Sequence, residues 1–122
     1  MNNFSHIITG VNGFLGSNLS SFFLKNGEVI TGVSRNPKKN EISYDQLFSN
    51  SYKSHTSFIH LAGKAHDIKN KSSKNEYFSA NTELTKKVFD CFLKSDCSVF
   101  IFLSSIKAVC DEFDGVISES IV

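Results

Sequence analysis

Three glycines at three-residue spacing constrain the fold of this 122-residue chain more than any other feature. Gly10, Gly13 and Gly16 follow a short β-branched run and open a segment with apolar residues at helical spacing. This order predicts a strand, a turn and a helix, with the N–H groups of Phe14 and Leu15 facing a phosphate. The first glycine allows the tight turn, the second allows a pyrophosphate to come close, and the third lets the helix pack near the strand.

Short apolar runs alternate with longer helical patterns along the chain, which is typical of parallel strands joined by helices. The expected strands cover residues 6–9, 28–33, 56–61 and 98–103, and a short helix is expected at 45–48. Longer helices are expected after the glycines and over 75–94, with apolar faces formed by Leu15, Leu19, Phe22 and Phe23 and by Tyr77, Leu84, Val88 and Phe92. The predicted fold is therefore α/β, a Rossmann-like doubly wound parallel sheet of four or five strands.

The predicted sheet is incomplete on its carboxyl-terminal side. The unbroken apolar run at 98–103 is typical of a central strand covered on both faces, yet no helical pattern follows Ser105. Part of one face would then expose apolar side chains. We therefore expect residues 1–122 to form the N-terminal part of a dinucleotide-binding domain without its C-terminal substrate-binding part, or to be covered by a partner or a second copy.

The composition argues against several other classes of protein. The formal net charge of +1 gives no reason to expect a nucleic-acid or membrane partner, and no apolar run approaches the roughly 20 residues of a membrane helix. Three cysteines without CxxC spacing predict neither a disulfide framework nor a zinc site, and they favour the cytoplasm. His60 and His66 have no third ligand nearby in the sequence, so we expect structural or surface histidines and no metal.

The end of the second predicted strand bears on which dinucleotide would bind. NAD-binding proteins usually place an acidic residue there, about 20 residues after the glycines, to hold the ribose 2′-hydroxyl. This chain has Ser34 at that place, followed by Arg35. A hydroxyl beside a guanidinium can accept a 2′-phosphate, whereas a carboxylate would repel it. The sequence therefore favours NADP, with NAD as the alternative, and Arg35 without such a role would be an exposed strand-end residue.

Four segments carry a resemblance to a known family. They are Thr-Gly-Val-Asn-Gly-Phe-Leu-Gly at 9–16, Phe-Ile-His-Leu-Ala-Gly at 58–63, Asn81 in the long predicted helix, and Phe-Leu-Ser-Ser at 102–105. Together they resemble the short-chain dehydrogenase/reductase superfamily, and most of all its extended branch, the NAD-dependent epimerase/dehydratase family that acts on nucleotide sugars. The resemblance covers the whole chain.

The resemblance implies roles for individual residues. Asp45 would contact the adenine amino group, and Asn81 would hold the loop or ribose near the nicotinamide, with a structural amide as the alternative. Ser105 would be the catalytic hydroxyl that hydrogen-bonds the substrate oxygen. Leu61, Ala62 and Gly63, at the end of the strand expected at 56–61 and just after it, would lie along the cofactor.

The implied activity is hydride transfer at a sugar carbon through a nicotinamide, in an epimerase or reductase, hence an isomerase or oxidoreductase. The family's Tyr-x-x-x-Lys pair does not occur after Ser105, since the last tyrosine is Tyr77. The chain alone is therefore expected to bind the dinucleotide without turnover. Ile106 and Lys107 stand where sugar dehydratases carry Asp and Glu, which disfavours dehydration. A non-catalytic NAD(P)-binding sensor and a non-sugar ketoreductase are the alternatives, and relatives commonly form homodimers.

Overall fold

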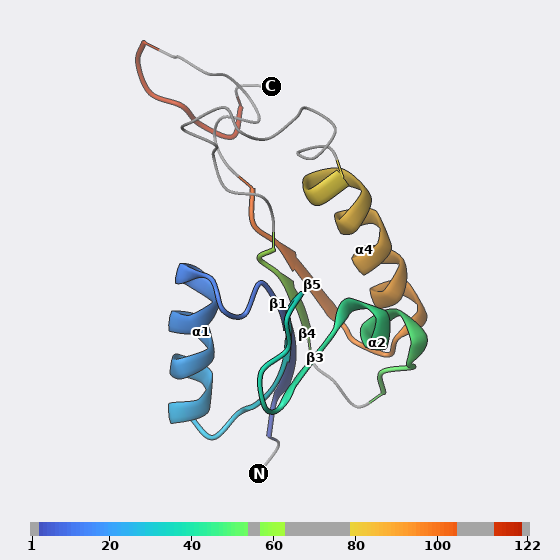
Figure 1. The fold of residues 1–122 in the computed structure, drawn as a ribbon. Helices are drawn as coiled ribbons and strands as arrows, with labels where there is room; N and C mark the ends of the chain where they lie inside the picture. Colours follow the sequence, from blue (N-terminus) through green and yellow to red (C-terminus); the bar gives the residue numbers. More distant parts are fainter. Residues whose placement is uncertain (1–2, 54–56, 63–78, 105–113, 121–122) are drawn as a thin grey trace.

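The framework of the structure is a five-stranded sheet in which each strand runs parallel to its neighbours (Figure 1). The computed structural model describes residues 3–53, 57–62, 79–104 and 114–120. The strands lie in the order β3-β2-β1-β4-β5. Their bounds are Ser5–Thr9 for β1, Val29–Val33 for β2, Glu41–Ile42 for β3, Ser57–His60 for β4 and Val99–Phe102 for β5.

β1 lies in the middle of the sheet, where both of its faces are covered. Ile7 and Ile8 are each 0% exposed and point to opposite faces because side chains alternate along a strand. Thr9 at the end of β1 is in register with Val33 of β2 and with His60 of β4. The strand order reverses direction between β1 and β4, and ligands in open α/β sheets bind at such a switch point.

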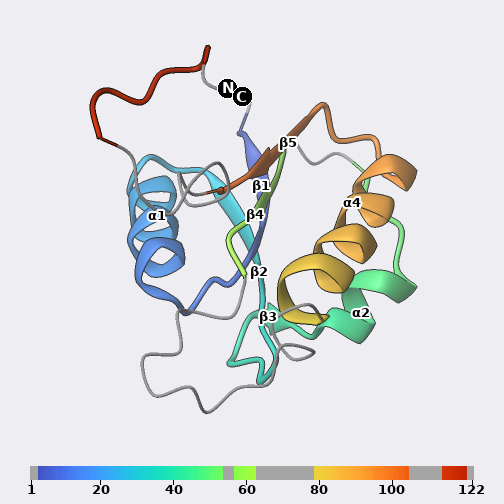
Figure 2. The same cartoon turned by 90° about the horizontal axis from the view of Figure 1, so that it is seen from above.

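Helices cover the two faces of the sheet unequally (Figure 2). α1, Phe14–Lys25, lies on one face, whereas α2, Tyr44–Ser49, and α4, Leu84–Lys94, lie on the other. A π-helical turn, η1, covers Ser79–Glu83 and leads into α4. In the part of the chain that the structure describes, no helix has both the length and the apolar character to cross a membrane.

A reciprocal cap explains why the short helix α2 begins where it does. The Gln46 N–H donates to Ser43 Oγ at 3.1 Å, and the Ser43 N–H donates to Gln46 Oε1 at 2.8 Å. This capping box satisfies two backbone donors that the helix itself cannot satisfy. The helix then places Leu47, 0% exposed, in the core. The prediction of a short helix at 45–48 is thus confirmed, with one more residue at each end.

Each face of the sheet has its own apolar cluster. On the α2 and α4 side, five side chains are each 0% exposed, namely Ile7, Val33, Leu47, Phe58 and Val88. On the α1 side the buried residues are Ile8, Val11 and Ile59, and the partly buried ones around them are Leu19, Phe23, Ile30 and Leu61. Four of the five strands and the two longer helices are confirmed within the described residues. Tyr77, which was predicted for the apolar face of the second of these helices, lies outside the described residues. The two-residue strand β3 was not predicted.

Two expectations about apolar residues are wrong. The run at 98–103 was expected to be a central strand, but β5 lies at the edge of the described sheet, and Ile101 is 46% exposed. Leu15 and Phe22 of α1 were expected to face the sheet, but they are 41% and 60% exposed. α1 packs over β1 and β2, so the α1 side of β5 has no helix over it among the described residues, which explains the exposure of Ile101. On α1 itself, Leu19 and Phe23 are the residues that pack against the sheet cluster, so the buried stripe is narrower than predicted.

Candidate functional site

The glycine loop joins β1 to α1 in a backbone shape that side chains would block. Gly10 has a φ of 69°, and a Cβ there would lie 2.7 Å from the backbone nitrogen of Ala62. A Cβ on Gly16 would overlap the Gly10 carbonyl oxygen. A Cβ on Gly13 would meet a single described atom within 4 Å, the Gly10 carbonyl oxygen at 3.3 Å. The fold itself therefore requires Gly10 and Gly16, whereas Gly13 leaves open space for an approaching group.

The N-terminus of α1 carries no cap within the described residues. Gly13 is the N-cap residue and has no side chain to accept from the first N–H groups, and the first turn contains no acidic residue. The first N–H groups of a helix have no partner within the helix, and the aligned peptide dipoles give this end partial positive charge. The N–H groups of Phe14 and Leu15 belong to this turn, and the Phe14 side chain is 88% exposed. This end of α1 is built to accept an anion.

A cavity of about 200 Å³ opens where β1, β2 and β4 end. It is lined by six residues that the sequence predicted for a cofactor site: Gly10, Gly13, Ser34, Arg35, Leu61 and Ala62. Asn12 and Tyr44 also line it and were not predicted. Asp45 and Asn81, which were predicted, are not among its lining residues. The structure therefore gathers half of the twelve predicted cofactor residues on one cavity. Phe14, Leu15 and Gly16 do not line it but form the adjoining first turn of α1.

Tyr44 reaches this cavity from the first residue of α2. Burial raises the pKa of its phenol, while hydrogen bonding with Thr9 and Gly10 and the charge of Arg35 act in the opposite direction. The phenol therefore stays protonated at neutral pH and can donate a hydrogen bond. No sequence pattern pointed to Tyr44, because its position depends on the unpredicted strand β3 and on the Ser43 cap.

A directed chain of hydrogen bonds anchors the loop after β4. Thr9 Oγ1 accepts from the N–H groups of Leu61 at 3.2 Å and Ala62 at 3.3 Å, and it lies 2.6 Å from His60 Nδ1. His60 Nε2 lies 2.9 Å from Thr85 Oγ1. The Thr85 hydroxyl donates its proton to the carbonyl oxygen of Asn81 at 2.8 Å. The chain thus runs from the cavity wall to η1.

The direction of these bonds sets the protonation of His60. The Thr85 hydroxyl donates its one hydrogen bond to the Asn81 carbonyl, so Thr85 Oγ1 must accept a hydrogen bond from the N–H at His60 Nε2. His60 Nδ1 is then unprotonated and accepts a hydrogen bond from the Thr9 hydroxyl. Both ring nitrogens are used in the neutral form, and burial lowers the pKa of His60. His60 is therefore a structural residue, as predicted. Among the described residues, no group of three or more His, Cys, Asp or Glu side chains lies close enough to hold a metal ion.

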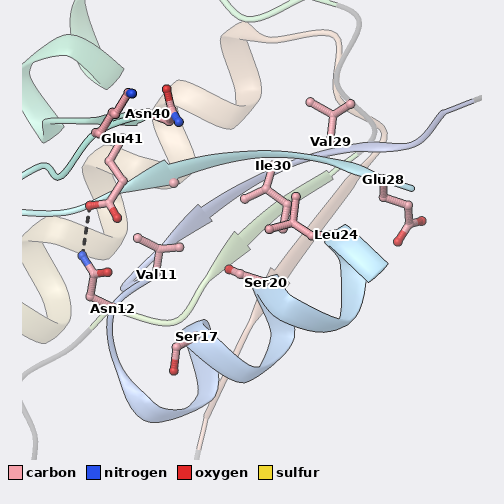
Figure 3. Close-up of a pocket in the computed structure, with 12 residues that line it drawn as sticks. Val11, Asn12, Ser17, Ser20, Leu24, Glu28, Val29, Ile30, Asn40 and Glu41 are labelled. Carbon is pink, nitrogen blue, oxygen red and sulfur yellow. Dashed lines mark hydrogen bonds between the residues drawn. The ribbon is translucent and has the colours of Figure 1, made fainter. Parts of the chain in front are cut away.

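Glu41 of β3 borders the cavity from outside. Its Oε1 accepts hydrogen bonds from Ser34 Oγ at 2.9 Å and from Asn12 Nδ2 at 3.0 Å, two residues that line the cavity. On its other side lies a larger groove of about 610 Å³ between α1 and β2 (Figure 3). None of the predicted site residues lines this groove. Glu41 lines the groove, and its hydrogen bond with Asn12 lies where the groove and the cavity meet, because Asn12 lines both.

Comparison with known protein families decides the relationship. A family model described as "NAD dependent epimerase/dehydratase family" matches residues 6–121, nearly the whole chain.

The chain belongs to the NAD-dependent epimerase/dehydratase family.

Solved structures share the fold of this epimerase/dehydratase chain. MoeE5 in complex with UDP-glucose and NAD has 22% sequence identity and a TM-score of 0.79, over 95% of this chain and 41% of MoeE5. The UDP-N-acetylglucosamine 4-epimerase from Bacillus cereus has 19% identity and a TM-score of 0.78, over 98% and 43% of the two chains. The human epimerase family protein SDR39U1 with NADPH has 24% identity and a TM-score of 0.67, over 76% and 33%.

These comparisons confirm the predicted family and the Rossmann-like fold. The chain spans less than half the length of each of these three solved structures. No curated protein sequence matches it. Gly63 of the cofactor loop and the predicted catalytic Ser105 lie outside the described residues, and their roles stay predictions.

Proposed function

We propose that this chain is the dinucleotide-binding part of a nucleotide-sugar epimerase or reductase. The observation that carries the proposal is the uncapped N-terminus of α1, which opens beside a cavity at the switch point of the sheet. Such a helix end binds phosphate, and the loops around a switch point hold the rest of a nucleotide. The bound nicotinamide would supply the chemistry, which is the acceptance and return of a hydride.

The described residues divide the work of holding the dinucleotide. The open side of Gly13 and the N–H groups of Phe14 and Leu15 would bind the pyrophosphate. The adenosine half would fill the cavity and contact Ser34, Arg35, Asn12 and Tyr44. Asp45, in the first turn of α2, would contact the adenine amino group. Asn12 and Tyr44 are additions to the sequence prediction. The N–H groups of Leu61 and Ala62 donate to Thr9 Oγ1, which fixes this backbone. The nicotinamide half of the cofactor would lie against it.

The substrate side of the proposal rests on family membership. Ser105 comes three positions after the last residue of β5 in the sequence and is proposed as the hydroxyl that hydrogen-bonds the substrate oxygen. Gly63 and Asn81 are proposed to flank the nicotinamide ribose. Sugar nucleotides are the proposed substrate class, supported by MoeE5 with UDP-glucose and by the UDP-N-acetylglucosamine 4-epimerase among structures of the same fold.

Isothermal titration of the chain with NAD and with NADP tests the proposal. Gly13→Val should weaken binding at least tenfold, because its side chain would fill the approach to the first turn of α1. The fold should persist, since the φ of −74° and ψ of 175° at Gly13 suit valine. Ser21→Ala, an exposed change on the same helix, should leave the affinity unaltered. The proposal fails if neither dinucleotide binds the wild type, or if the folded Gly13→Val variant binds with unchanged affinity.

A further inference from the structure

Three hydrogen-bond donors, one from the glycine loop and two from the connection between β2 and β3, converge on one oxygen atom of Glu41. Oε1 accepts from Asn12 Nδ2 in the glycine loop at 3.0 Å, a bond drawn in Figure 3, and from Ser34 Oγ after β2 at 2.9 Å. The third donor is the backbone N–H of Lys38 in the turn before β3, at 3.1 Å. Together these donors form a small anion-binding site that the carboxylate of the chain itself occupies.

The strand pairing explains why Glu41 reaches this point. Glu41 is in register with Gly32 on β2, and a Cβ added to Gly32 would lie 3.3 Å from Glu41 Cγ. The missing side chain of Gly32 therefore leaves room for the Glu41 stem to lie across β2. The backbone N–H of Glu41 also donates to the Lys38 carbonyl at 3.0 Å, which closes the turn and fixes the residue.

Glu41 is ionised at neutral pH. Desolvation by burial would raise its pKa, but hydrogen bonds from Lys38, Asn12 and Ser34, together with the charge of Lys38, lower it below its ordinary value. A full negative charge therefore lies within hydrogen-bonding distance of the Ser34 hydroxyl. Ser34 ends β2, where proteins of this fold place the group that meets the adenosine ribose 2′ position.

This arrangement treats the two dinucleotides differently. A 2′-phosphate carries close to two negative charges, and it would need the Ser34 and Asn12 donors that Glu41 already uses. A 2′-hydroxyl can instead donate to the carboxylate, which has about four lone-pair sites on two oxygens, while all three described bonds go to Oε1. Arg35 would attract a phosphate, but it is exposed, so solvent and salt screen its charge.

We propose that Glu41, presented from β3, makes this site select NAD over NADP. The inference rests on the proposed dinucleotide-binding function and names the cofactor for it. It opposes the NADP preference that Ser34 and Arg35 suggest in the sequence. The acidic residue that holds the ribose would thus come from the neighbouring strand rather than from the end of β2.

Titration of the full chain with NAD and NADP, for wild type, Glu41→Gln and Glu41→Ala, tests the proposal. Wild type should bind NAD at least tenfold more tightly than NADP. Glu41→Gln removes the charge at nearly constant volume, and Glu41→Ala frees all three donors. Both variants should shift the affinity ratio toward NADP by tenfold or more. Glu28→Gln is the matched control, because Glu28 precedes β2 at the opposite end of the strand and should leave the ratio unchanged.

The outcomes separate the two proposals. Tighter binding of NADP than NAD by the wild type overturns the role of Glu41 and leaves the dinucleotide site standing. An unchanged ratio of NAD to NADP affinity in both variants, shown by circular dichroism to be folded, would also overturn the role of Glu41 and leave the dinucleotide site standing. Absence of binding of either dinucleotide to the folded wild type overturns both the role of Glu41 and the proposed function.

Discussion

The two faces of the sheet differ in how completely they are covered. On the α2 and α4 side, Phe58 and Val88 are each 0% exposed, and aromatic rings pack edge to face across the cluster. On the α1 side, Ile101 of β5 is 46% exposed and Phe22 of α1 is 60% exposed. Two helices, α2 and α4, cover the first side, whereas α1 alone covers the second side among the described residues. Stability should therefore depend strongly on the buried side chains under α2 and α4, and weakly on the exposed apolar side chains of β5 and α1 on the other side.

The largest effect should come from Phe58→Ala in β4. Its ring is fully buried and lies 6.0 Å from the ring of Phe92, so truncation should reduce the free energy of unfolding by about 3–5 kcal/mol. Phe22→Ala, the same substitution on the open face, should cost less than about 1 kcal/mol. Urea denaturation followed by circular dichroism measures both. Equal losses in the two variants would show that the faces do not differ.

A smaller effect is expected from Thr85→Val in α4. Valine has nearly the same shape but cannot accept the proton of His60 Nε2, which would be left buried without a partner. The loss should be about 1–3 kcal/mol, the usual cost of such a group. Thr85→Ser keeps the hydroxyl and should recover most of the stability. If valine and serine are equally tolerated, the hydrogen-bond chain does not stabilise the covered face.

The same chain should make the protein sensitive to acid. Burial lowers the pKa of His60 in the folded state, so the unfolded chain takes up its proton at a higher pH than the folded chain does. The contribution of His60 is thus complete above about pH 6.5, the ordinary histidine value, and is lost as the pH falls below it. Unfolding at several pH values, with the His60 ring followed by NMR, measures this. Titration of His60 near its ordinary value in the folded protein would contradict it.

The smallest effect on stability should come from Ile101→Ser in β5. Because the side chain is already 46% exposed, the free energy of unfolding should change by no more than about 0.5 kcal/mol. Fluorescence of a hydrophobic dye should decrease, since an exposed apolar side chain has been removed. A loss comparable to that of Phe58→Ala would show that something covers this face in solution.

The sequence predicted those features that local rules determine. Gly10, Gly13 and Gly16 stand out because few other residues tolerate that turn, and the strand before it and the helix after it repeat apolar residues with the expected periods. Ser34 and Arg35 could be placed because they end a clear strand. Each of these is visible within a window of a few residues, and each lines or adjoins the observed cavity.

The features that the sequence could not predict depend on contacts between distant segments. Glu41 and Tyr44 reach the site through β3, a strand of two residues with no period to detect. Thr9 and His60 meet across 51 residues of sequence, so neither reveals its partner. The edge position of β5 depends on which strands flank it, and an apolar run carries no information about its neighbours.

The groove beside Glu41 lies next to the connection between β2 and β3, which contains no helix, although parallel strands are usually joined through one. Residues 34–40 make this connection. The groove lies between α1, which contributes Ser20 and Leu24, and β2, which contributes Ile30 (Figure 3). Ser20 Oγ is buried there without a hydrogen-bond partner among the described residues. The free energy of closing a loop grows slowly with its length, so added residues should cost little entropy here. They would, however, displace the Lys38 N–H that holds Glu41 Oε1. The length of this turn therefore matters more to the position of Glu41, and so to the choice of cofactor, than to the stability of the sheet.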